Sequence, residues 1–447
     1  MIKYLLIKVI FLFIVIIMNY NKIKYNYNNY NYNNNYYNKY NLNLKNQIRI
    51  GIVSKSLKNG GAERQTSLLL YHFSKIKVFK LYLFTKNDVQ ENEFSIESKI
   101  KRIPIKKNLI DYLDHYRINI LLYQLYDETE MNLLNSYNKT KTIFINRSCF
   151  LHWIYYKFYD QYKTIYRIYQ KAKYIISLIH FENDYLFEKW GINSILMNNF
   201  IPYEYYSIIP SNLSSKTIVM IGRGSDETKR FILGIKSMNY IIEEIPECEM
   251  IIISELNIEY LQKYVHNSNL IKKINFVGYK SNPEQYYRNA SLHIFPSLVE
   301  AFPNVLSEAL VYGIPTILVG LDYVSAAKGG TIIIYDDSPL SIAKIAIKLL
   351  KDKAYIQKLG KEARENIKQF NNELLSKKWI NLIISIYKED NYYDMLRNNE
   401  KKISKNESLK IIKNQIDLLK LRNKKFRNIT IHDIENFTFI EDIGHFC

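Results

Sequence analysis

The feature that most constrains the fold of this chain is an alternation of short apolar stretches with longer segments, which runs through the sequence twice. The short stretches predict strands, and strands that alternate with helices build a parallel, doubly wound sheet. The first series of predicted strands covers 48–53, 81–84, 118–123, 142–145, 174–177 and 195–197. The second series covers 218–221, 250–253, 274–277, 292–295, 316–319 and 331–334. Two such series predict two α/β domains.

The chain of 447 residues is long enough for both domains, since a typical domain has roughly 100–200 residues. The segment 198–215, between the two series, contains Pro202, Pro210 and a cluster of Ser and Asn, which is typical of a linker. We therefore expect a first domain at 47–205 and a second at 214–387, whose last predicted helices cover 355–387. Residues 388–447 form a charged C-terminal tail.

The N-terminal segment predicts attachment to a membrane. Residues 4–19 form an apolar run near the lower length limit for crossing a bilayer, and Lys8 lies close enough to its end to reach the interface. The run is not followed by the small residues typical of a signal-peptide cleavage site, which favours a signal-anchor at 1–20. Residues 21–46 are rich in Asn and Tyr and predict a disordered spacer. We expect a single-pass protein of the endomembrane system, with its orientation left open because Lys residues flank both ends of the run.

The net charge of +19 favours anionic substrates or membrane surfaces over nucleic acid as partners. The Lys residues are scattered along predicted helices and loops, and the sequence contains no recognition helix, zinc finger or aromatic RNA-binding signature. A basic run from Lys401 to Arg427 can meet anionic lipid, but a solvated helix face is the favoured explanation. Three widely spaced Cys residues predict neither a metal site nor a disulfide framework.

The segment from Phe295 to Thr316 carries the pattern most specific for function. Glu300 lies in a predicted loop after a strand, and Glu308 lies inside the helix that follows. Pro303 suits the first turn of that helix and Gly313 its C-terminal end. The N-terminus of a helix offers free backbone N–H groups and a partial positive charge to a phosphate. With a carboxylate on each side to accept hydrogen bonds from hydroxyls, this helix end can hold a nucleotide sugar.

These residues resemble the E-x7-E signature of the group 1 glycosyltransferases, which are retaining enzymes. The family has the GT-B fold, in which two Rossmann-like domains face each other across a cleft. Three further stretches fit the family around the two acids: Phe276-Val-Gly-Tyr279, Phe295-Pro-Ser297 and Glu308-Ala-Leu-Val-Tyr-Gly-Ile-Pro315. Upstream, Gly60-Gly-Ala-Glu-Arg64 resembles the N-terminal glycine-rich loop, and 221–229 resembles the loop with the phosphate-binding Arg and Lys. The resemblance covers about residues 47–387.

The resemblance implies a role for each matching residue. Glu300 would contact hydroxyls of the donor sugar, and Glu308 would contact the ribose hydroxyls of the nucleotide. Arg223 and Lys229 would stabilise the departing phosphate in place of a metal ion, so no metal or other cofactor is expected. The remaining donor-binding residues would be Gly222, Gly278, Tyr279, Phe302, Pro303 and Asn304. Gly60 and Gly61 would let the backbone approach a ligand at the mouth of the first domain.

Two positions depart from the family pattern. Ala301 stands where the family commonly has Gly, which places a methyl group beside the donor pocket. The family often has a His at the end of a first-domain strand, but Asn146 follows the predicted strand 142–145. His152 a few residues later, or Asn146 or Arg147, would supply the polar contact, unless activity is reduced. His293 lies inside a predicted strand and reads as a core residue.

The sequence therefore predicts a membrane-anchored, metal-independent retaining glycosyltransferase. It would bind a nucleoside-diphosphate sugar mainly through the second domain, and a glycan, lipid-linked or other acceptor mainly through the first. Two alternatives stay open: a nucleotide-sugar epimerase or another enzyme of the same fold, and a catalytically impaired protein that acts as a binding or scaffold module.

Overall fold

The computed structural model describes residues 47–396 with short gaps, and then part of the tail. The gaps are at 59, 150–151, 153–158, 181, 185–190, 203–206, 224–225, 256–258, 260–267, 281, 392 and 395, and the tail is described at 410–418 except 412 and 416. The predicted signal-anchor at 1–20 and the spacer at 21–46 lie outside the described residues. Within the described part, no helix is both long and apolar enough to span a bilayer.

The first domain is built on a seven-stranded sheet in the order β3-β2-β1-β4-β5-β6-β7. All neighbouring strands in it are parallel. Its strands are β1 (Ile48–Ser54), β2 (Phe79–Thr85), β3 (Lys101–Pro104), β4 (Ile120–Tyr123), β5 (Lys141–Ile145), β6 (Tyr174–Ser177) and β7 (Ile195–Leu196). The sequence did not predict β3, because its Lys, Arg and Pro are residues of an exposed edge rather than of a buried strand.

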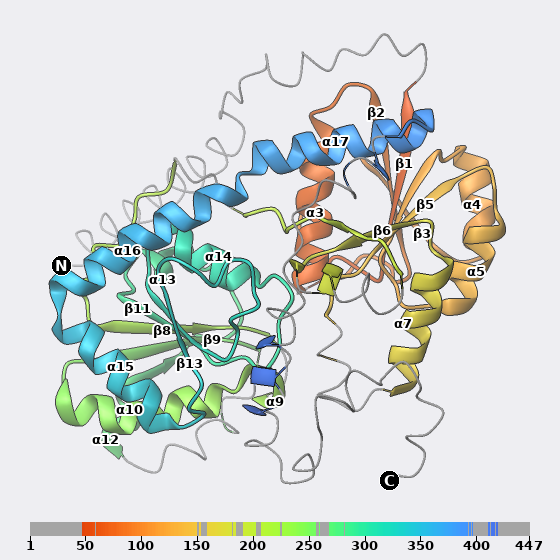
Figure 1. The fold of residues 1–447 in the computed structure, drawn as a ribbon. Coiled ribbons are helices and arrows are strands. Elements are labelled where there is room, and N and C mark those ends of the chain that lie inside the picture. The colour runs from red at the N-terminus through yellow and green to blue at the C-terminus, as the bar shows by residue number, and fades with distance from the viewer. Residues whose placement is uncertain are drawn as a thin grey trace, which may run out of the picture.

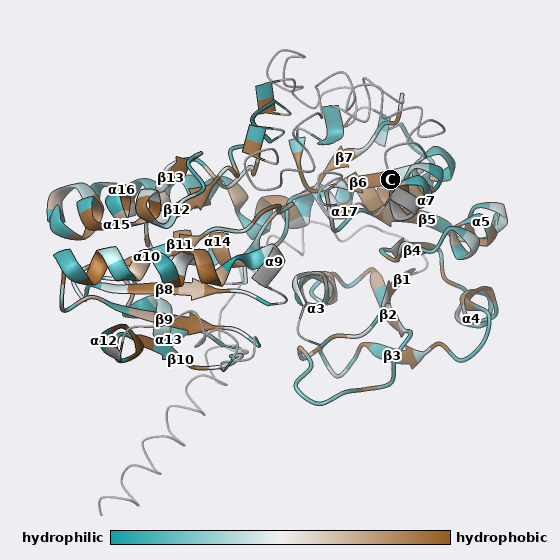
Figure 2. Ribbon diagram, turned by 90° about the horizontal axis from the view of Figure 1, so that it is seen from below, coloured by the Kyte–Doolittle hydropathy of each residue, from teal (hydrophilic) through white to brown (hydrophobic). Residues whose placement is uncertain are grey.

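The second domain repeats the architecture with a six-stranded sheet in the order β10-β9-β8-β11-β12-β13. Its strands, also all parallel, are β8 (Thr217–Ile221), β9 (Glu249–Ile253), β10 (Ile274–Phe276), β11 (Leu292–Phe295), β12 (Thr316–Val319) and β13 (Thr331–Ile334). Figure 2 shows how strongly hydrophobic these strands are, as expected when helices cover both faces of a parallel sheet. The prediction of two doubly wound parallel domains is confirmed.

Helices surround both sheets (Figure 1). The first domain contains α3 (Gly61–Ser74), α4 (Leu109–Tyr116), α5 (Glu128–Ser136) and α7 (Tyr159–Lys171). The second contains α9 (Asp226–Lys229), α10 (Phe231–Glu244), α12 (Ser268–Ile271), α13 (Glu284–Arg288), α14 (Asn304–Val311), α15 (Pro339–Lys351) and α16 (Lys353–Ile367). The 3-10 turn η2 (Lys368–Phe370) and helix α17 (Asn372–Lys388) follow.

Helices α3 and α14 begin without the usual side-chain cap, as do α10 and α13. Polar side chains accept a first-turn N–H ahead of α4, α5, α15, α16 and α17. Helix α3 begins after Gly60 and helix α14 after Pro303, and neither residue makes such a bond. Because the first N–H groups of a helix lack intrahelical acceptors, these two N-termini keep donors for other groups.

Helix α17 belongs by sequence to the second domain but packs on the first. Trp379, Ile380 and Ile383 are buried in the same cluster as Phe73 of α3 and the strands of the first sheet. The Trp379 ring meets Phe73 edge-on at 6.0 Å between centroids. Figure 1 shows α17 running from the second domain to the edge of β1 and β2. The last helix of the second domain therefore returns to brace the first domain.

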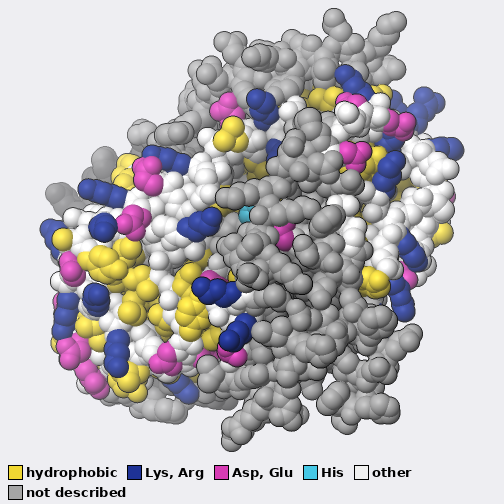
Figure 3. All heavy atoms as spheres, in the orientation of Figure 1, with side chains coloured by type: hydrophobic (Ala, Val, Ile, Leu, Met, Phe, Trp, Pro, Cys, Tyr) yellow, Lys and Arg dark blue, Asp and Glu magenta, His cyan; other side chains and the backbone are white. Residues whose placement is uncertain are grey.

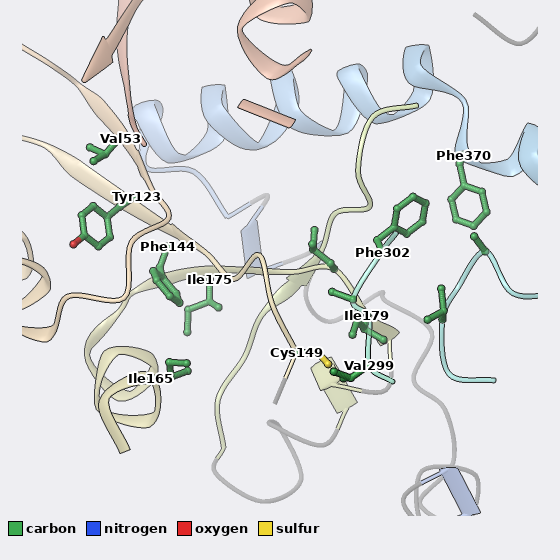
Figure 4. Close-up of a cluster of buried hydrophobic side chains, with 14 of the residues drawn as sticks. Val53, Tyr123, Phe144, Cys149, Ile165, Ile175, Ile179, Val299, Phe302 and Phe370 are labelled. Atoms are coloured by element: carbon green, nitrogen blue, oxygen red, sulfur yellow. The ribbon is translucent and has the colours of Figure 1, made fainter. Parts of the chain in front are cut away.

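A second hydrophobic cluster joins the two domains directly. It contains Phe144 and Cys149 of the first domain together with Val299 and Phe302 of the second (Figure 4). The ring of Phe302 lies edge-on to Phe370 at 5.1 Å between centroids. Because this cluster continues from one domain into the other, the loop before α14 is held against the first domain by burial of apolar surface.

Polar side chains join the domains at the same place. Gln65 on α3 donates to the Oδ1 atom of Asn304 at 3.1 Å. Asn199, near the end of the first domain, donates to the carbonyl of Phe302 at 2.9 Å and to Asn304 Oδ1 at 3.2 Å. The first turn of α14 is thereby fixed relative to α3.

The described part of the tail packs on the folded domains. Tyr393 is buried against Tyr174 of the first domain, with ring centroids 4.9 Å apart. Leu418 is buried on the second domain, where Asn414 donates to Asp322 at 3.0 Å. The prediction of a charged tail thus omitted apolar residues that the chain uses for packing.

Candidate functional site

A cavity of about 520 Å³ lies between the two domains. The first domain contributes the residues around the start of α3 and the end of β5, and the second contributes the loops after β8 and β11. It is lined by these sequence-predicted residues: Gly60, Gly61, Gly222, Arg223, Lys229, Tyr279, Glu300, Phe302, Pro303, Asn304 and Glu308. Gly278 is not among the lining residues; it has a φ of +69°, which explains the glycine by backbone conformation.

The topology of the second sheet explains why distant motifs meet in this cavity. Strands β8 and β11 are parallel neighbours, with Leu292 paired with Ile218. The loops that follow them therefore leave from the same edge of the sheet, where ligands bind in doubly wound folds. A backbone hydrogen bond of 2.9 Å from Leu298 to Thr228 joins the two loops. Lys229 and Glu300 are placed together as a result.

Helix α14 has the bounds that its sequence signals indicated. Pro303 is the N-cap, one position before the first turn, where its missing N–H costs nothing. Gly313 has a φ of +70°, the left-handed conformation that ends helices and favours glycine. The N-terminus of α14 faces the cavity, so its first backbone N–H groups are positioned for an anion.

Glu308 is completely buried, and both of its oxygens have partners. Oε2 accepts from the Tyr287 hydroxyl at 2.9 Å, and Oε1 contacts Nη1 of Arg64 at 2.6 Å. Arg64 belongs to α3 of the first domain, so this ion pair crosses the cavity. Burial raises the pKa of Glu308, whereas the charge of Arg64 and the bond from Tyr287 lower it.

Glu300 and Lys229 form a second ion pair, within the second domain. The backbone N–H of Glu300 donates to the Tyr323 hydroxyl at 3.1 Å, which fixes the loop that carries the carboxylate. Both side chains are mostly buried, with 13% of Glu300 and 20% of Lys229 exposed. The sequence identified both residues but not their contact, since only the fold brings the loops together.

His152 also lies at this pair. It lines the cavity, and the electric field of Glu300 raises its pKa while that of Lys229 lowers it. Burial is the largest influence and lowers the pKa of His152 overall. Of the three residues that sequence offered in place of a strand-end His, His152 is thus beside the predicted catalytic pair.

Asn146 is used inside the first domain rather than at the cavity. Its side chain is 1% exposed. Its Oδ1 atom accepts from the Tyr126 hydroxyl at 2.7 Å and from the N–H of Ser148 at 3.1 Å, and its amide donates to Glu182 at 2.7 Å. Glu182 is itself 1% exposed, and burial raises its pKa to about 8.

Arg147 does line the cavity. It donates from Nε to Gln124 at 2.9 Å and from Nη1 to Asn199 at 3.1 Å. Its buried Nη2 atom has no hydrogen-bond partner among the residues that the structure describes. Burial lowers the pKa of Arg147 to about 10, a value at which the group stays charged at neutral pH. Arg147 therefore presents a fixed positive charge on the first-domain wall.

The glycine-rich loop is close to the loop after β8 in the other domain. A Cβ atom on Gly60 would lie 1.5 Å from Oε2 of Glu63 and 3.0 Å from Nη1 of Arg223. These atoms are the ends of flexible side chains, and the φ of −129° at Gly60 suits any residue, so the observation shows how near Glu63 and Arg223 come to the glycine-rich loop. At Gly222 a Cβ would lie 3.4 Å from the stem of Lys229, which is an ordinary contact distance.

Several predicted donor residues have clear packing roles as well. The Phe302 ring is buried in the cluster between the domains, and Ala301 packs in the same cluster. The side chain of Asn304 is taken up by contacts with Gln65 and Asn199. His293 is fully buried with Nδ1 3.2 Å from the Thr316 hydroxyl, so the prediction of a core residue is confirmed.

Sequence analysis gave no role of their own to Glu63 and Arg64, which it named only as part of the glycine-rich motif. Their position directly after Gly60 and Gly61 could have identified them, because residues next to a loop at the mouth of the cavity can also line that cavity. Among the residues that the structure describes, no group of three or more His, Cys, Asp or Glu is arranged to hold a metal ion.

Comparison with known proteins gives a family match for the second domain. A family model described as glycosyl transferases group 1 matches residues 206–366. A curated relative, the poly(glycerol-phosphate) alpha-glucosyltransferase of Bacillus subtilis (strain 168), is 27% identical over 158 residues. That alignment covers 34% of this chain and only 23% of the relative's length.

Solved structures resemble the whole two-domain body. The sucrose-phosphate synthase of Thermosynechococcus elongatus superposes with a TM-score of 0.64 at 15% identity, covering 77% of this chain and 100% of that one. Anabaena HepE, determined in complex with UDP and glucose, has a TM-score of 0.59 at 12% identity and covers 76% of this chain and 100% of its own. At these identities the likeness concerns the fold, and it confirms the GT-B-like arrangement of two domains.

Proposed function

We propose that the chain, whose second domain matches the family model of the group 1 glycosyltransferases, transfers a sugar, with retention of configuration, from a nucleoside-diphosphate sugar to a hydroxylated acceptor. The observation that carries this proposal is the convergence of Glu300, Glu308, Arg223 and Lys229 on one cavity between the domains. These residues come from separate loops and a helix, and the cavity is where the fold places ligands.

The donor is proposed to lie along the N-terminus of α14. Its diphosphate would accept hydrogen bonds from the first N–H groups of that helix, next to the cations Arg223 and Lys229. Glu308 would accept hydrogen bonds from the ribose, and Glu300 from the transferred sugar. Anabaena HepE, which shares the fold and binds UDP and glucose in its solved structure, supports a nucleotide sugar as the class of donor.

The proposed reaction breaks the bond between the anomeric carbon and the phosphate oxygen. The acceptor hydroxyl attacks from the same face, and its proton passes to the departing diphosphate. Negative charge builds on that diphosphate, and fixed cations aimed at a developing charge stabilise a transition state. Arg223 and Lys229 supply this charge from the protein itself, so the proposal requires no metal.

The acceptor is proposed to contact the first-domain wall. Arg147 and His152 line the cavity there, opposite the loop that carries Glu300. His152 would take the place of the strand-end His of the family, because it is electrostatically coupled to both Glu300 and Lys229. A glycan, a lipid-linked sugar or another polyol fits this wall, and the name of the Bacillus relative supports a hydroxylated polymer.

We also propose that the protein acts at a membrane. This rests on the apolar run at 4–19 and the basic balance of the chain, with 62 Lys and Arg against 43 Asp and Glu. In Figure 3 the basic and acidic side chains of the visible described surface are interspersed. That distribution favours small anionic substrates over a nucleic-acid surface.

The experiment starts with a thermal-shift screen of the full-length protein against UDP, GDP and their sugars. The nucleotide sugar that stabilises the protein is then incubated with candidate acceptors, and the products are analysed by mass spectrometry and NMR. A glycosylated acceptor with the donor's anomeric configuration is the expected product. A new nucleotide sugar formed without acceptor would identify an epimerase, and no turnover or hydrolysis of any donor would identify a binding module.

A further inference from the structure

The ion pair between Arg64 and Glu308 places a first-domain cation on the carboxylate that is proposed to bind ribose. Their atoms lie 2.6 Å apart, and the side chains of Glu308 and Arg64 are 0% and 19% exposed. The other Glu308 oxygen faces the protein interior, where the Tyr287 hydroxyl is buried. Oε1 is therefore the oxygen on the cavity side, and Arg64 occupies it.

A ribose hydroxyl at Oε1 must compete with this guanidinium. A carboxylate has room for more than one donor, but Glu308 is completely buried and its second oxygen is already bonded. When Arg64 moves away from Oε1 of Glu308, the two hydroxyls of a ribose can donate hydrogen bonds to that carboxylate in its place. Without such a replacement, the buried charge of Glu308 would be left unpaired at a high cost.

The surroundings give the displaced guanidinium a second partner when a diphosphate is present. Arg64 and Arg223 both act electrostatically on the Tyr279 hydroxyl, so the two cations share one neighbourhood. Among the described lining residues, five are Lys or Arg and three are Glu. Because cations outnumber carboxylates in this cavity, an Arg64 that leaves Glu308 finds its matching charge in the phosphates of the donor.

We propose that Arg64 is a donor-binding residue which exchanges its ion pair with Glu308 for one with the diphosphate when a nucleotide binds. The inference rests on the proposed function, because it needs Glu308 to meet the ribose. It assigns the first domain a direct contact with the donor. It also makes Arg64 a determinant of specificity for nucleoside diphosphates over nucleosides, since a nucleoside displaces Arg64 and offers no phosphate in return.

The test compares two ligands on the same variants. Uridine and UDP, with guanosine and GDP as a second pair, are titrated into the parent, Arg64→Ala, Arg64→Lys and Lys75→Ala by calorimetry and ligand-observed NMR. Lys75 follows the same helix at its far end, where it pairs with Glu97 at 3.6 Å outside the cavity, so Lys75→Ala is the matched control. Circular dichroism and thermal melting establish that each variant is folded.

For Arg64→Ala we expect diphosphate affinity to fall at least about tenfold, the loss expected for a charge-assisted contact. Nucleoside affinity should stay within a few-fold of the parent or rise. Arg64→Lys keeps the positive charge but not the paired N–H donors of the guanidinium group. Its diphosphate affinity should therefore lie between that of the parent and that of Arg64→Ala. If Arg64→Ala does not fold, Arg64→Lys carries the test with a several-fold loss for the diphosphate alone.

Three results would overturn the inference. Equal losses for nucleoside and diphosphate would show that Arg64 only positions Glu308. Unchanged or tighter diphosphate binding would show that Arg64 only competes with the donor. If the parent binds neither UDP nor GDP, the proposed function fails together with the inference, whereas the first two results leave the proposed function intact.

Discussion

The ammonium group of Lys229 contacts the carboxylate of Glu300, 71 residues later in the chain. Each residue was predicted to act on the donor, and the structure shows that each also neutralises the other. A donor that binds between them therefore meets a pair whose charges are already balanced. On the proposed function, Lys229 would turn toward the leaving phosphate as negative charge develops there, while Glu300 would turn toward the sugar hydroxyls.

Replacing Lys229 by Ala should reduce turnover more than donor affinity. The charge that Lys229 meets increases as the anomeric bond breaks, so its contribution is largest in the transition state. We expect a fall in kcat of about 10²–10³, as for other groups that stabilise a developing anion. The measurement is steady-state transfer alongside nucleotide titration, with Lys351→Ala at an exposed ion pair as control. An unchanged kcat would mean that Arg223 alone serves the leaving group.

Replacing Glu308 by Ala should instead weaken donor binding. The hydrogen bonds proposed between Glu308 and the ribose would be present before and during the reaction, so their loss would appear in donor affinity. The cost should be about 1.5–3 kcal/mol, as for hydrogen bonds to a charged group. Titration of the variant with a nucleoside diphosphate measures it, and Glu284→Ala, at a partly exposed pair in the same domain, is the control. Parent-like binding by the Glu308 variant would contradict the assigned donor site.

Replacing His152 by Ala should lower turnover about three- to tenfold, the equivalent of one lost hydrogen bond of about 0.5–1.5 kcal/mol. Burial lowers the pKa of His152, so the imidazole is neutral at pH 7 and becomes charged only below its usual range. The parent should therefore keep its activity to a lower pH than an enzyme whose site His has the usual pKa. The rate is measured across pH 5–8, with the exposed His115→Ala as control. A variant with the parent's rates and pH profile would exclude His152 from the site.

Replacing Glu182 by Gln should stabilise the protein relative to the parent as the pH rises. The folded protein holds the Glu182 proton up to about pH 8, while the unfolded chain releases it near its ordinary value of 4.5. The contribution of protonated Glu182 to the free energy of unfolding is therefore complete below about pH 4.5, and it is lost as the pH rises toward 8. The gain of the variant should grow by about 1.4 kcal/mol per pH unit across that window. Denaturant unfolding at pH 5, 6.5 and 8 measures it, with the exposed Glu243→Gln as control, and a pH-independent difference would contradict the expectation.

The alternation of strands and helices was predictable because most of the parallel strands are largely apolar and buried. All of the strands of the second sheet were found, as in Ile218–Ile221 within β8 and Leu292–Phe295 in β11. The exception, β3, is an edge strand whose Lys101, Arg102 and Pro104 carry no apolar pattern. The tail residues Tyr393 and Leu418 were missed for a similar reason, because single apolar side chains in a charged segment have no period.

By itself the sequence determined the two parallel domains, the bounds of helix α14 and the identities of Glu300, Glu308, Arg223 and Lys229. These depend on local rules, since hydrophobic period, helix-ending glycine and motif spacing act over a few residues. Only the tertiary structure decided that Arg64 meets Glu308, that Lys229 meets Glu300 and that His152, not Asn146, lies at the cavity. Such contacts join segments far apart in the chain. Packing between the domains brings Arg64 to Glu308, and the parallel pairing of β8 with β11 brings the loops of Lys229 and Glu300 together.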